Sequence, residues 1–165
     1  MASINSLSSR VKVLTGMQVL VVENDRDSRD LYAVLLTIYG AKVTTIGSVK
    51  DALDLLDRLI PDLVICEIRF LGESVYPLIQ RVRELKSSRG RVPILVTPTC
   101  SPASLAQQLT LKVEAYLRKP IDIDQLVYEV WNLLLMSKTA HLLNTQNWVE
   151  RKYVDQALCR AAIAG

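Results

Sequence analysis

The chain has 165 residues, of which 50% are hydrophobic and 22% are charged, and its formal net charge is +3. This composition is typical of one globular domain with a modest extension, and the mild charge without a dense Lys/Arg cluster predicts no nucleic-acid binding. Apolar runs such as residues 133–136 are too short to span a membrane, and the N-terminal residues contain no apolar core of signal-peptide length. We therefore expect a cytoplasmic protein that has no contact with a membrane.

The chain has few side chains that would bind a transition metal. Cys66, Cys100 and Cys159 show no metal-type spacing, and His141 is the single histidine. Free thiols in a reducing compartment are the simplest interpretation of three cysteines.

Short apolar runs alternate with helical patterns along the chain. The runs predict strands at residues 17–22, 42–46, 62–66, 93–97 and 113–117, and their continuous apolar character indicates burial on both faces of a sheet. Between them, helices are predicted at residues 25–39, 48–60, 72–86, 101–111 and 122–136, and the polar residues 87–91 are predicted to form a loop.

Capping residues and apolar spacing define these helices. Asp25 and Ser48 are suitable N-caps, Gly40 and Pro61 follow helix ends, and Pro77 suits a first turn. The predicted apolar faces are Leu31, Val34, Leu35 and Ile38 in the first helix, Ala52, Leu53, Leu56 and Leu59 in the second, and Val75, Leu78, Ile79 and Val82 in the third.

Five β-α units predict an α/β fold, a flavodoxin-like doubly wound sheet of five parallel strands in the order 2-1-3-4-5. We expect an N-terminal tail at residues 1–16, one domain at 17–136 and a C-terminal helical extension at 137–165. Residues 145–164 have a helical apolar stripe. It would either fold back on the domain or serve as a dimerisation or partner helix, and the sequence does not decide between these.

Polar residues end all but one of the predicted strands or follow them closely. Glu23 and Asn24 follow the first strand, Glu67 follows the third, Thr97 ends the fourth, and Lys119 follows the fifth. In a doubly wound sheet the functional site lies at the carboxyl ends of the strands. Each of these residues alone is best interpreted as a solvated loop residue, but together they predict a pocket with one lysine.

These motifs resemble the receiver domain of two-component response regulators over about residues 17–136. The resemblance rests on residues 21–24, 61–67, 93–97 and 116–120, whose order and spacing together are fairly specific. It implies a site in which an acidic pair and a phosphoacceptor aspartate hold Mg²⁺, a Thr or Ser hydroxyl contacts the phosphoryl group, and a lysine neutralises charge. It also implies a cis bond between Lys119 and Pro120.

The sequence departs from the family pattern at several site positions. Glu67 stands where the phosphoacceptor aspartate is expected, and Asn24 replaces the second acidic residue. An extra methylene displaces the carboxylate by more than about 1 Å, which is enough to spoil in-line attack. Counting from Pro93 places Pro98 at the hydroxyl position, whereas counting back from Lys119 places Thr97 there. We also expect the Arg69 side chain to reach the pocket and replace the cation, leaving at most weak Mg²⁺ binding at Glu23, Asn24 and Glu67.

We therefore interpret the chain as an atypical receiver domain, or pseudo-receiver. It would be no enzyme and would act through protein–protein contacts, with Glu67 standing in for phosphoaspartate and paired with Lys119. One alternative is a phosphorylatable, Mg²⁺-dependent response regulator. A second is a structural adaptor that attaches through its C-terminal helix. The expected partner is a histidine kinase, a downstream regulator or a second copy in a homodimer.

Aromatic and apolar residues mark candidate interaction surfaces. The last helix of the domain should turn Ile123, Leu126, Val127, Val130 and Leu134 toward the sheet. Its second stripe, Tyr128, Trp131 and Leu135, would meet either the C-terminal residues Trp148 and Tyr153 or a partner. By the resemblance, Tyr116 is at the aromatic switch position, which in many members turns inward on activation. Phe70 is either a further anchor or incidental.

Overall fold

The computed structural model describes residues 12–88, 90–99 and 113–142 of the chain. In chain order the elements are β1 (Gln18–Val22), α1 (Arg26–Ile38), β2 (Lys42–Ile46), α2 (Val49–Leu56), β3 (Leu63–Cys66), α3 (Tyr76–Glu84), β4 (Lys86–Ser87), β5 (Gly90–Arg91), β6 (Ile94–Val96), β7 (Ala115–Tyr116) and α5 (Ile123–Leu142). The predicted helix at 101–111 and the C-terminal residues Trp148 and Tyr153 lie outside the described residues.

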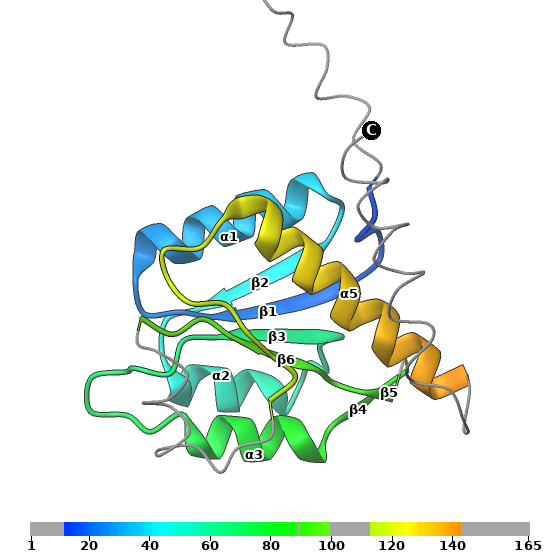
Figure 1. The fold of residues 1–165 in the computed structure, drawn as a ribbon. Coiled ribbons are helices and arrows are strands. Elements are labelled where there is room, and N and C mark those ends of the chain that lie inside the picture. The colour runs from blue at the N-terminus through cyan, green and yellow to red at the C-terminus, as the bar shows by residue number, and fades with distance from the viewer. Residues whose placement is uncertain (1–11, 89, 100–112, 143–165) are drawn as a thin grey trace, which may run out of the picture.

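The main sheet has five parallel strands in the order β2-β1-β3-β6-β7. This order and the flavodoxin-like fold confirm the predicted fold class. Helices α1 and α5 cover one face of the sheet, and α2 and α3 cover the other (Figure 1). Of the described part of the chain, no helix combines the length and apolar character needed to cross a membrane.

Alternate residues of each strand face opposite layers, because successive side chains in a strand point to opposite sides. Val19, Val21, Leu63, Ile65 and Leu95 pack in the cluster with α1 and α5. Leu20, Val22, Val64, Cys66, Ile94 and Val96 pack in the cluster with α2 and α3. Two-sided burial explains the continuous apolar runs in the sequence.

The predicted caps form as expected at the first two helices. Asp25 accepts a hydrogen bond from the Ser28 backbone N–H at 2.8 Å, and Ser48 accepts one from Asp51 at 3.1 Å. Pro77 lies in the first turn of α3. At α5, Asp122 accepts a hydrogen bond from the Gln125 N–H at 3.0 Å. Each cap satisfies an N–H group that has no partner within the helix.

The predicted inner face of α1 is wrong by about one residue. Leu31, Val34 and Ile38 are exposed, whereas Tyr32, Leu35 and Leu36 are buried. Leu35 belongs to both sets, so the helix is rotated about its axis relative to the prediction. The tyrosine ring carries enough apolar surface to bury, which a count of aliphatic residues alone overlooks.

Three other predicted features differ from the structure. The residues expected as a loop contain a short antiparallel hairpin, β4 and β5. Helix α5 continues past Met136 to Leu142, and the Ser137 hydroxyl donates a hydrogen bond to the Arg91 carbonyl at 2.9 Å. The hairpin thus gives the extra turns of α5 a partner. Helix α3 begins at Tyr76 rather than near Gly72, because residues 70–73 form a turn.

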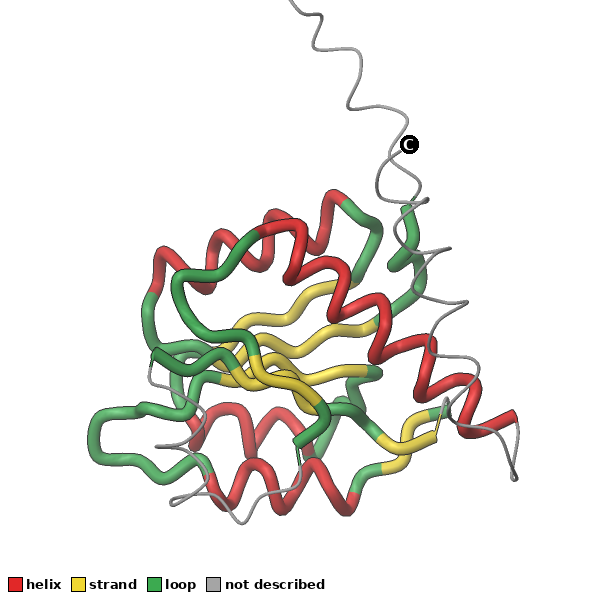
Figure 2. Tube along the Cα trace, in the orientation of Figure 1, coloured by secondary structure: helices red, strands yellow, loops and turns green. Residues whose placement is uncertain are grey.

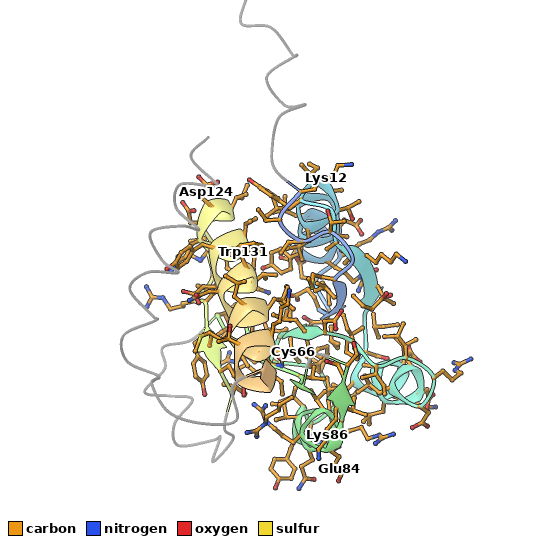
Figure 3. All side chains as sticks on the ribbon, turned by 90° about the vertical axis from the view of Figure 1, so that its right-hand side faces the viewer. Lys12, Cys66, Glu84, Lys86, Asp124 and Trp131 are labelled. Atoms are coloured by element: carbon orange, nitrogen blue, oxygen red, sulfur yellow. The ribbon has the colours of Figure 1, made fainter. Side chains whose placement is uncertain are left out.

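The inner face of α5 is confirmed at Leu126, Val127, Val130 and Leu134, but Ile123 is exposed and Leu133 is buried instead. The second stripe, Tyr128, Trp131 and Leu135, is only half-buried. Trp131 packs against the α1 and α5 cluster (Figure 3), so part of this stripe serves the core. Phe70 is buried beside α2 and α3, which excludes it as an exposed anchor.

Candidate functional site

The candidate site lies at the carboxyl ends of the parallel strands, where each strand leads into a loop (Figure 2). Val22 pairs with Cys66, and Cys66 pairs with Val96. The next residue of each strand therefore lies in one row: Glu23, Glu67 and Thr97. Backbone hydrogen bonds continue the row, from Glu67 N–H to the Val22 carbonyl at 2.9 Å and from Thr97 N–H to the Cys66 carbonyl at 3.0 Å.

The row also decides which layer these side chains face. Glu23, Glu67 and Thr97 follow the alternation of Val21, Ile65 and Leu95, which pack toward α1 and α5. The structure therefore places Thr97, not Pro98, in the row beside Glu67. All three side chains are at most 3% exposed. Burial of two carboxylates is costly unless they are paired and hydrogen-bonded.

Lys119 forms an ion pair with each of the two buried glutamates. Its Nζ lies 2.7 Å from Glu23 Oε2 and 2.9 Å from Glu67 Oε2. The peptide bond that follows, between Lys119 and Pro120, is cis, as the resemblance implies. Burial by itself lowers the pKa of Lys119, but the hydrogen bonds and negative charges of the two glutamates outweigh it and raise the pKa above its usual value.

Backbone N–H groups engage the remaining carboxylate oxygens. Glu67 Oε1 accepts hydrogen bonds from the N–H groups of Ile68 at 2.6 Å and Arg69 at 3.2 Å. Glu23 Oε1 accepts one from the Asp25 N–H at 3.0 Å. Each oxygen of both carboxylates therefore has a donor, so both buried carboxylates are satisfied.

Asn24 and Arg69 meet through the backbone and not through the guanidinium. Asn24 Nδ2 donates to the Arg69 carbonyl at 3.0 Å. The Arg69 side chain is exposed and makes no hydrogen bond or ion pair with a described residue, so the prediction that it enters the pocket is wrong. The loop geometry turns it toward solvent.

Arg29 is a site residue that sequence reasoning missed. Its Nη1 donates to the Glu23 carbonyl at 2.8 Å. A Cβ at Gly47 would approach Nη1 to 2.6 Å, so the glycine leaves room for the guanidinium. Its place in the first turn of α1, beside the end of β1, was the available signal.

The side chains of this site are not arranged as ligands of a divalent cation. The Lys119 ammonium lies between the carboxylates of Glu23 and Glu67. The Asn24 amide nitrogen donates to the Arg69 carbonyl, which could otherwise serve as a further oxygen ligand. Mg²⁺ requires several oxygen ligands in octahedral geometry. The carboxylate oxygens of Glu23 and Glu67 and the Arg69 carbonyl already accept hydrogen bonds.

Thr97 is the one member of the row without a partner. Its Oγ1 is buried and forms no hydrogen bond with any described residue. Tyr116 is 39% exposed, so its ring points outward. The structure thus brings Glu23, Glu67 and Lys119 into direct contact, with Asn24 and Thr97 beside them and Tyr116 on the surface.

Comparison with known sequences agrees with this geometry. Residues 19–130 match the response regulator receiver domain. The chain belongs to this family. Receiver domains are modules of two-component signalling.

The chain is similar to two curated proteins of different length. It is 33% identical over 117 residues to an uncharacterized 14.6 kDa protein of Leptolyngbya boryana, covering 71% of this chain and 89% of that protein. It is 34% identical over 116 residues to Regulator of RpoS of Escherichia coli, covering 68% of this chain but only 33% of that protein. Similarity to the latter therefore concerns one part of a longer protein.

Solved receiver domains share the fold. A response regulator receiver protein from Burkholderia phymatum is 25% identical with a TM-score of 0.62, covering 72% of this chain and 94% of that one. The receiver domain of a sensor histidine kinase from Pseudomonas aeruginosa, with magnesium coordinated in its active-site cleft, is 21% identical with a TM-score of 0.64, covering 73% and 98%. The similarity to the Pseudomonas aeruginosa receiver domain is a similarity of fold alone.

Proposed function

We propose that this receiver domain is a pseudo-receiver that acts in signal transduction through protein–protein contacts, without accepting a phosphoryl group. The 2.9 Å contact between Lys119 Nζ and Glu67 Oε2, at a carboxylate only 3% exposed, carries the proposal. In the family, the phosphoacceptor is an aspartate at this position. Here Glu67 takes its place, and its charge is compensated within the chain.

The surroundings of Glu67 oppose its use as a nucleophile. One oxygen accepts two backbone hydrogen bonds and the other is bound to Lys119. Attack on a phosphodonor would require an oxygen to leave these donors and to move by the length of the extra methylene. A displacement of about 1 Å can cost a factor of about 10² in rate. We propose no catalytic role for the domain and no Mg²⁺ requirement.

The Glu67–Lys119 pair would hold the domain in one conformation. In many members of the family the aromatic residue at the position of Tyr116 turns inward on activation. Tyr116 is 39% exposed, and Thr97 Oγ1 is not hydrogen-bonded to Glu67. These observations favour a domain fixed in the outward arrangement over one in which Glu67 reproduces the activated state.

The test is the intact mass of the protein after incubation with Mg²⁺ and a small acyl phosphate, beside Glu67→Asp. We expect no added phosphate on the natural chain. Labelling of Glu67→Asp alone would identify Glu67 as the block, whereas a labelled natural chain would overturn the proposal.

A second measurement concerns the conformation. Glu67→Gln and Glu67→Ala should alter the exposure of Tyr116, followed by fluorescence quenching, or the oligomeric state. Glu84→Gln, on the outer surface of α3, is the matched control because among the described residues Glu84 makes only an exposed ion pair with Arg81. If neither Glu67 variant differs from the control, the carboxylate fixes no conformation.

One observation favours the alternative of a phosphorylatable response regulator. The buried Thr97 hydroxyl has no described partner, and a phosphoryl oxygen would provide one. The mass measurement decides between the two functions. The adaptor alternative depends on the C-terminal extension predicted at residues 137–165, of which 143–165 lie outside the described residues. A truncation that tests it belongs after Leu142, where α5 ends, rather than after Met136.

A further inference from the structure

The outer face of α1 carries a stripe of apolar side chains that is open to solvent. Leu31, Val34 and Ile38 are 48%, 61% and 45% exposed. Their spacings of three and four residues put them on one face of the helix, in the pattern of a coiled-coil seam. Among the described residues, no other helix exposes more than one large hydrophobic side chain. The stripe is therefore suited to contact with another helix.

This stripe is separate from the face of α1 that packs on the sheet. Tyr32, Leu35 and Leu36 are buried in the cluster that α1 shares with α5. A surface helix needs one apolar face for the core, and its outer side is usually polar. Single exposed apolar residues are common, whereas a contiguous exposed group marks an interaction site. Helix α1 thus has a second apolar face that its own fold does not use.

The N-terminal end of α1 is acidic. Asp25, Asp27 and Asp30 are exposed there, together with Arg26, which pairs with Asp30 at 3.7 Å. Arg29 is half-buried and donates to a backbone carbonyl of the candidate site at 2.8 Å. Three carboxylates against two guanidinium groups leave one net negative charge. Asp27 lies one turn before Leu31, so it continues the apolar stripe at this end.

The C-terminal end of α1 is basic. Lys42 is exposed two residues after Gly40, and Lys12 is exposed beside that glycine, because a Cβ at Gly40 would lie 3.0 Å from Lys12 Cβ. Residues 31–50 contain no acidic residue. The carboxylate of Asp62, just before β3, is buried and accepts a backbone N–H of β1. The two ends of the helix therefore present opposite charges to solvent.

We propose that this stripe is the contact surface of a homodimer in which α1 packs antiparallel against α1 of a second copy. A two-fold interface must be self-complementary. With Val34 near the axis, Leu31 of each copy faces Ile38 of the other, and Asp27 approaches Lys42 at both ends of the contact. Parallel packing would instead bring the two acidic ends together. The opposed helix dipoles also favour the antiparallel arrangement.

The size of the contact sets its strength. Helix α1 has 13 residues and is about 20 Å long, so one helix pair buries less than the about 800 Å² per partner of a standard interface. We therefore expect a weak dimer that forms in the micromolar range of concentration. The inference names a second copy as a partner, and the role of this dimer in signalling rests on the proposed function. The contact itself does not involve Glu67.

The test is sedimentation equilibrium of the full chain over a range of concentrations. We expect a monomer–dimer equilibrium that Val34→Glu weakens about tenfold or more, because two carboxylates would meet at the axis. Ile60→Glu is the matched control, since Ile60 is 51% exposed between α2 and β3. Both variants change exposed side chains, so both should keep the natural melting temperature. A natural chain that stays monomeric, or equal effects of the two variants, overturns the proposal and leaves the stripe to a helix of another protein.

Charge exchange tests the orientation of the helices. Asp27→Lys and Lys42→Glu should each weaken the dimer, because each places two pairs of like charges in the contact. An equal mixture of the two variants should associate again, since both contacts of the mixed dimer then join opposite charges. Tighter association of Asp27→Lys with the natural chain than of the natural chain with itself would indicate parallel packing and contradict the proposed arrangement.

Failure of this dimer can be distinguished from failure of the proposed function. If Glu67→Gln dissociates the dimer and Val34→Glu does not, the copies meet through another surface. The α1 contact is then wrong, and the proposed function stands. If Val34→Glu dissociates the dimer while the natural chain gains phosphate in the mass measurement, the α1 contact stands and the proposed function is wrong.

Discussion

Lys119 Nζ lies within 2.9 Å of Glu67 Oε2 although the two residues are 52 positions apart in the chain. The same ammonium contacts Glu23 at 2.7 Å, so one cation serves two buried carboxylates. Removing the partner of a buried charge costs far more than the net value of the pair. This asymmetry makes the site testable by stability measurements that need no partner protein.

Lys119→Met should destabilise the fold by about 3 kcal/mol, because it leaves two carboxylates buried and unpaired. Glu67→Gln should cost less, since the amide oxygen can still accept a hydrogen bond. Urea denaturation checks both values. The double variant should be less destabilised than the sum of the single ones, with a coupling of about 1 kcal/mol or more. Strict additivity would show that the contact contributes no energy.

The contribution of Lys119 to the stability of the fold should be lost at alkaline pH. The pKa of Lys119 is raised in the folded state, so its contribution is fully present below its unfolded value, about 10.4, and is lost as the pH rises through the folded pKa. The urea midpoint of the natural chain should therefore fall above that pH more steeply than that of Lys119→Met. Parallel curves would contradict the pairing. Burial also raises the pKa of Tyr32, and the charge of Lys119 partly opposes this rise, so the curve of Lys119→Met includes a changed contribution from Tyr32.

Cys66 should resist thiol reagents in the native state. It is fully buried in the middle of the molecule (Figure 3), and burial, together with the charges of Glu67 and Glu23, raises its pKa strongly. Labelling with a disulfide reagent, located by peptide mass, should occur at Cys66 only on unfolding. Rapid native labelling would show that the strand end opens. In Cys66→Ala, the loss of stability that begins above about pH 8.5 should disappear, because the unfolded thiol no longer ionises.

Thr97→Val should leave the domain as stable or more stable by about 1 kcal/mol, since it replaces an unpaired buried hydroxyl with a methyl group of similar size. Thr44→Val is the matched control, because Thr44 Oγ1 accepts a hydrogen bond from Gln18 Nε2 at 3.3 Å and should lose stability. Urea midpoints compare them. A marked loss at position 97 would mean that the hydroxyl has a partner in solution.

Glu73→Gln should loosen the start of α2 and the turn before α3. Its carboxylate accepts two backbone hydrogen bonds and places negative charge at a helix N-terminus, where it is favourable by about 0.5 kcal/mol or more. Hydrogen exchange should accelerate at Val49 and Lys50. Glu84→Gln should leave both amides unchanged. Equal protection in both variants would show that the turn is held by Phe70 alone.

The order of the sheet strands and the positions of the site residues could be predicted from the residue pattern alone. Continuous apolar runs mark strands buried on both faces, and the residues just after them must meet at one edge because parallel strands end on the same side. Glu23, Glu67 and Lys119 could therefore be placed before any coordinates. Thr97 remained uncertain by one position, since the register of β6 depends on pairing with β3.

The division of side chains between core and surface depends on how the folded elements pack together. Tyr32 displaced Leu31 and Val34 from the core because the helix rotates to bury the larger ring. Arg69 turned outward because its carbonyl and N–H are held by Asn24 and Glu67. Glu73 caps a helix that starts 24 residues earlier, a contact set by loop geometry rather than by local pattern. Spacing along a chain reports periodicity, whereas these contacts depend on how separate elements are oriented in space.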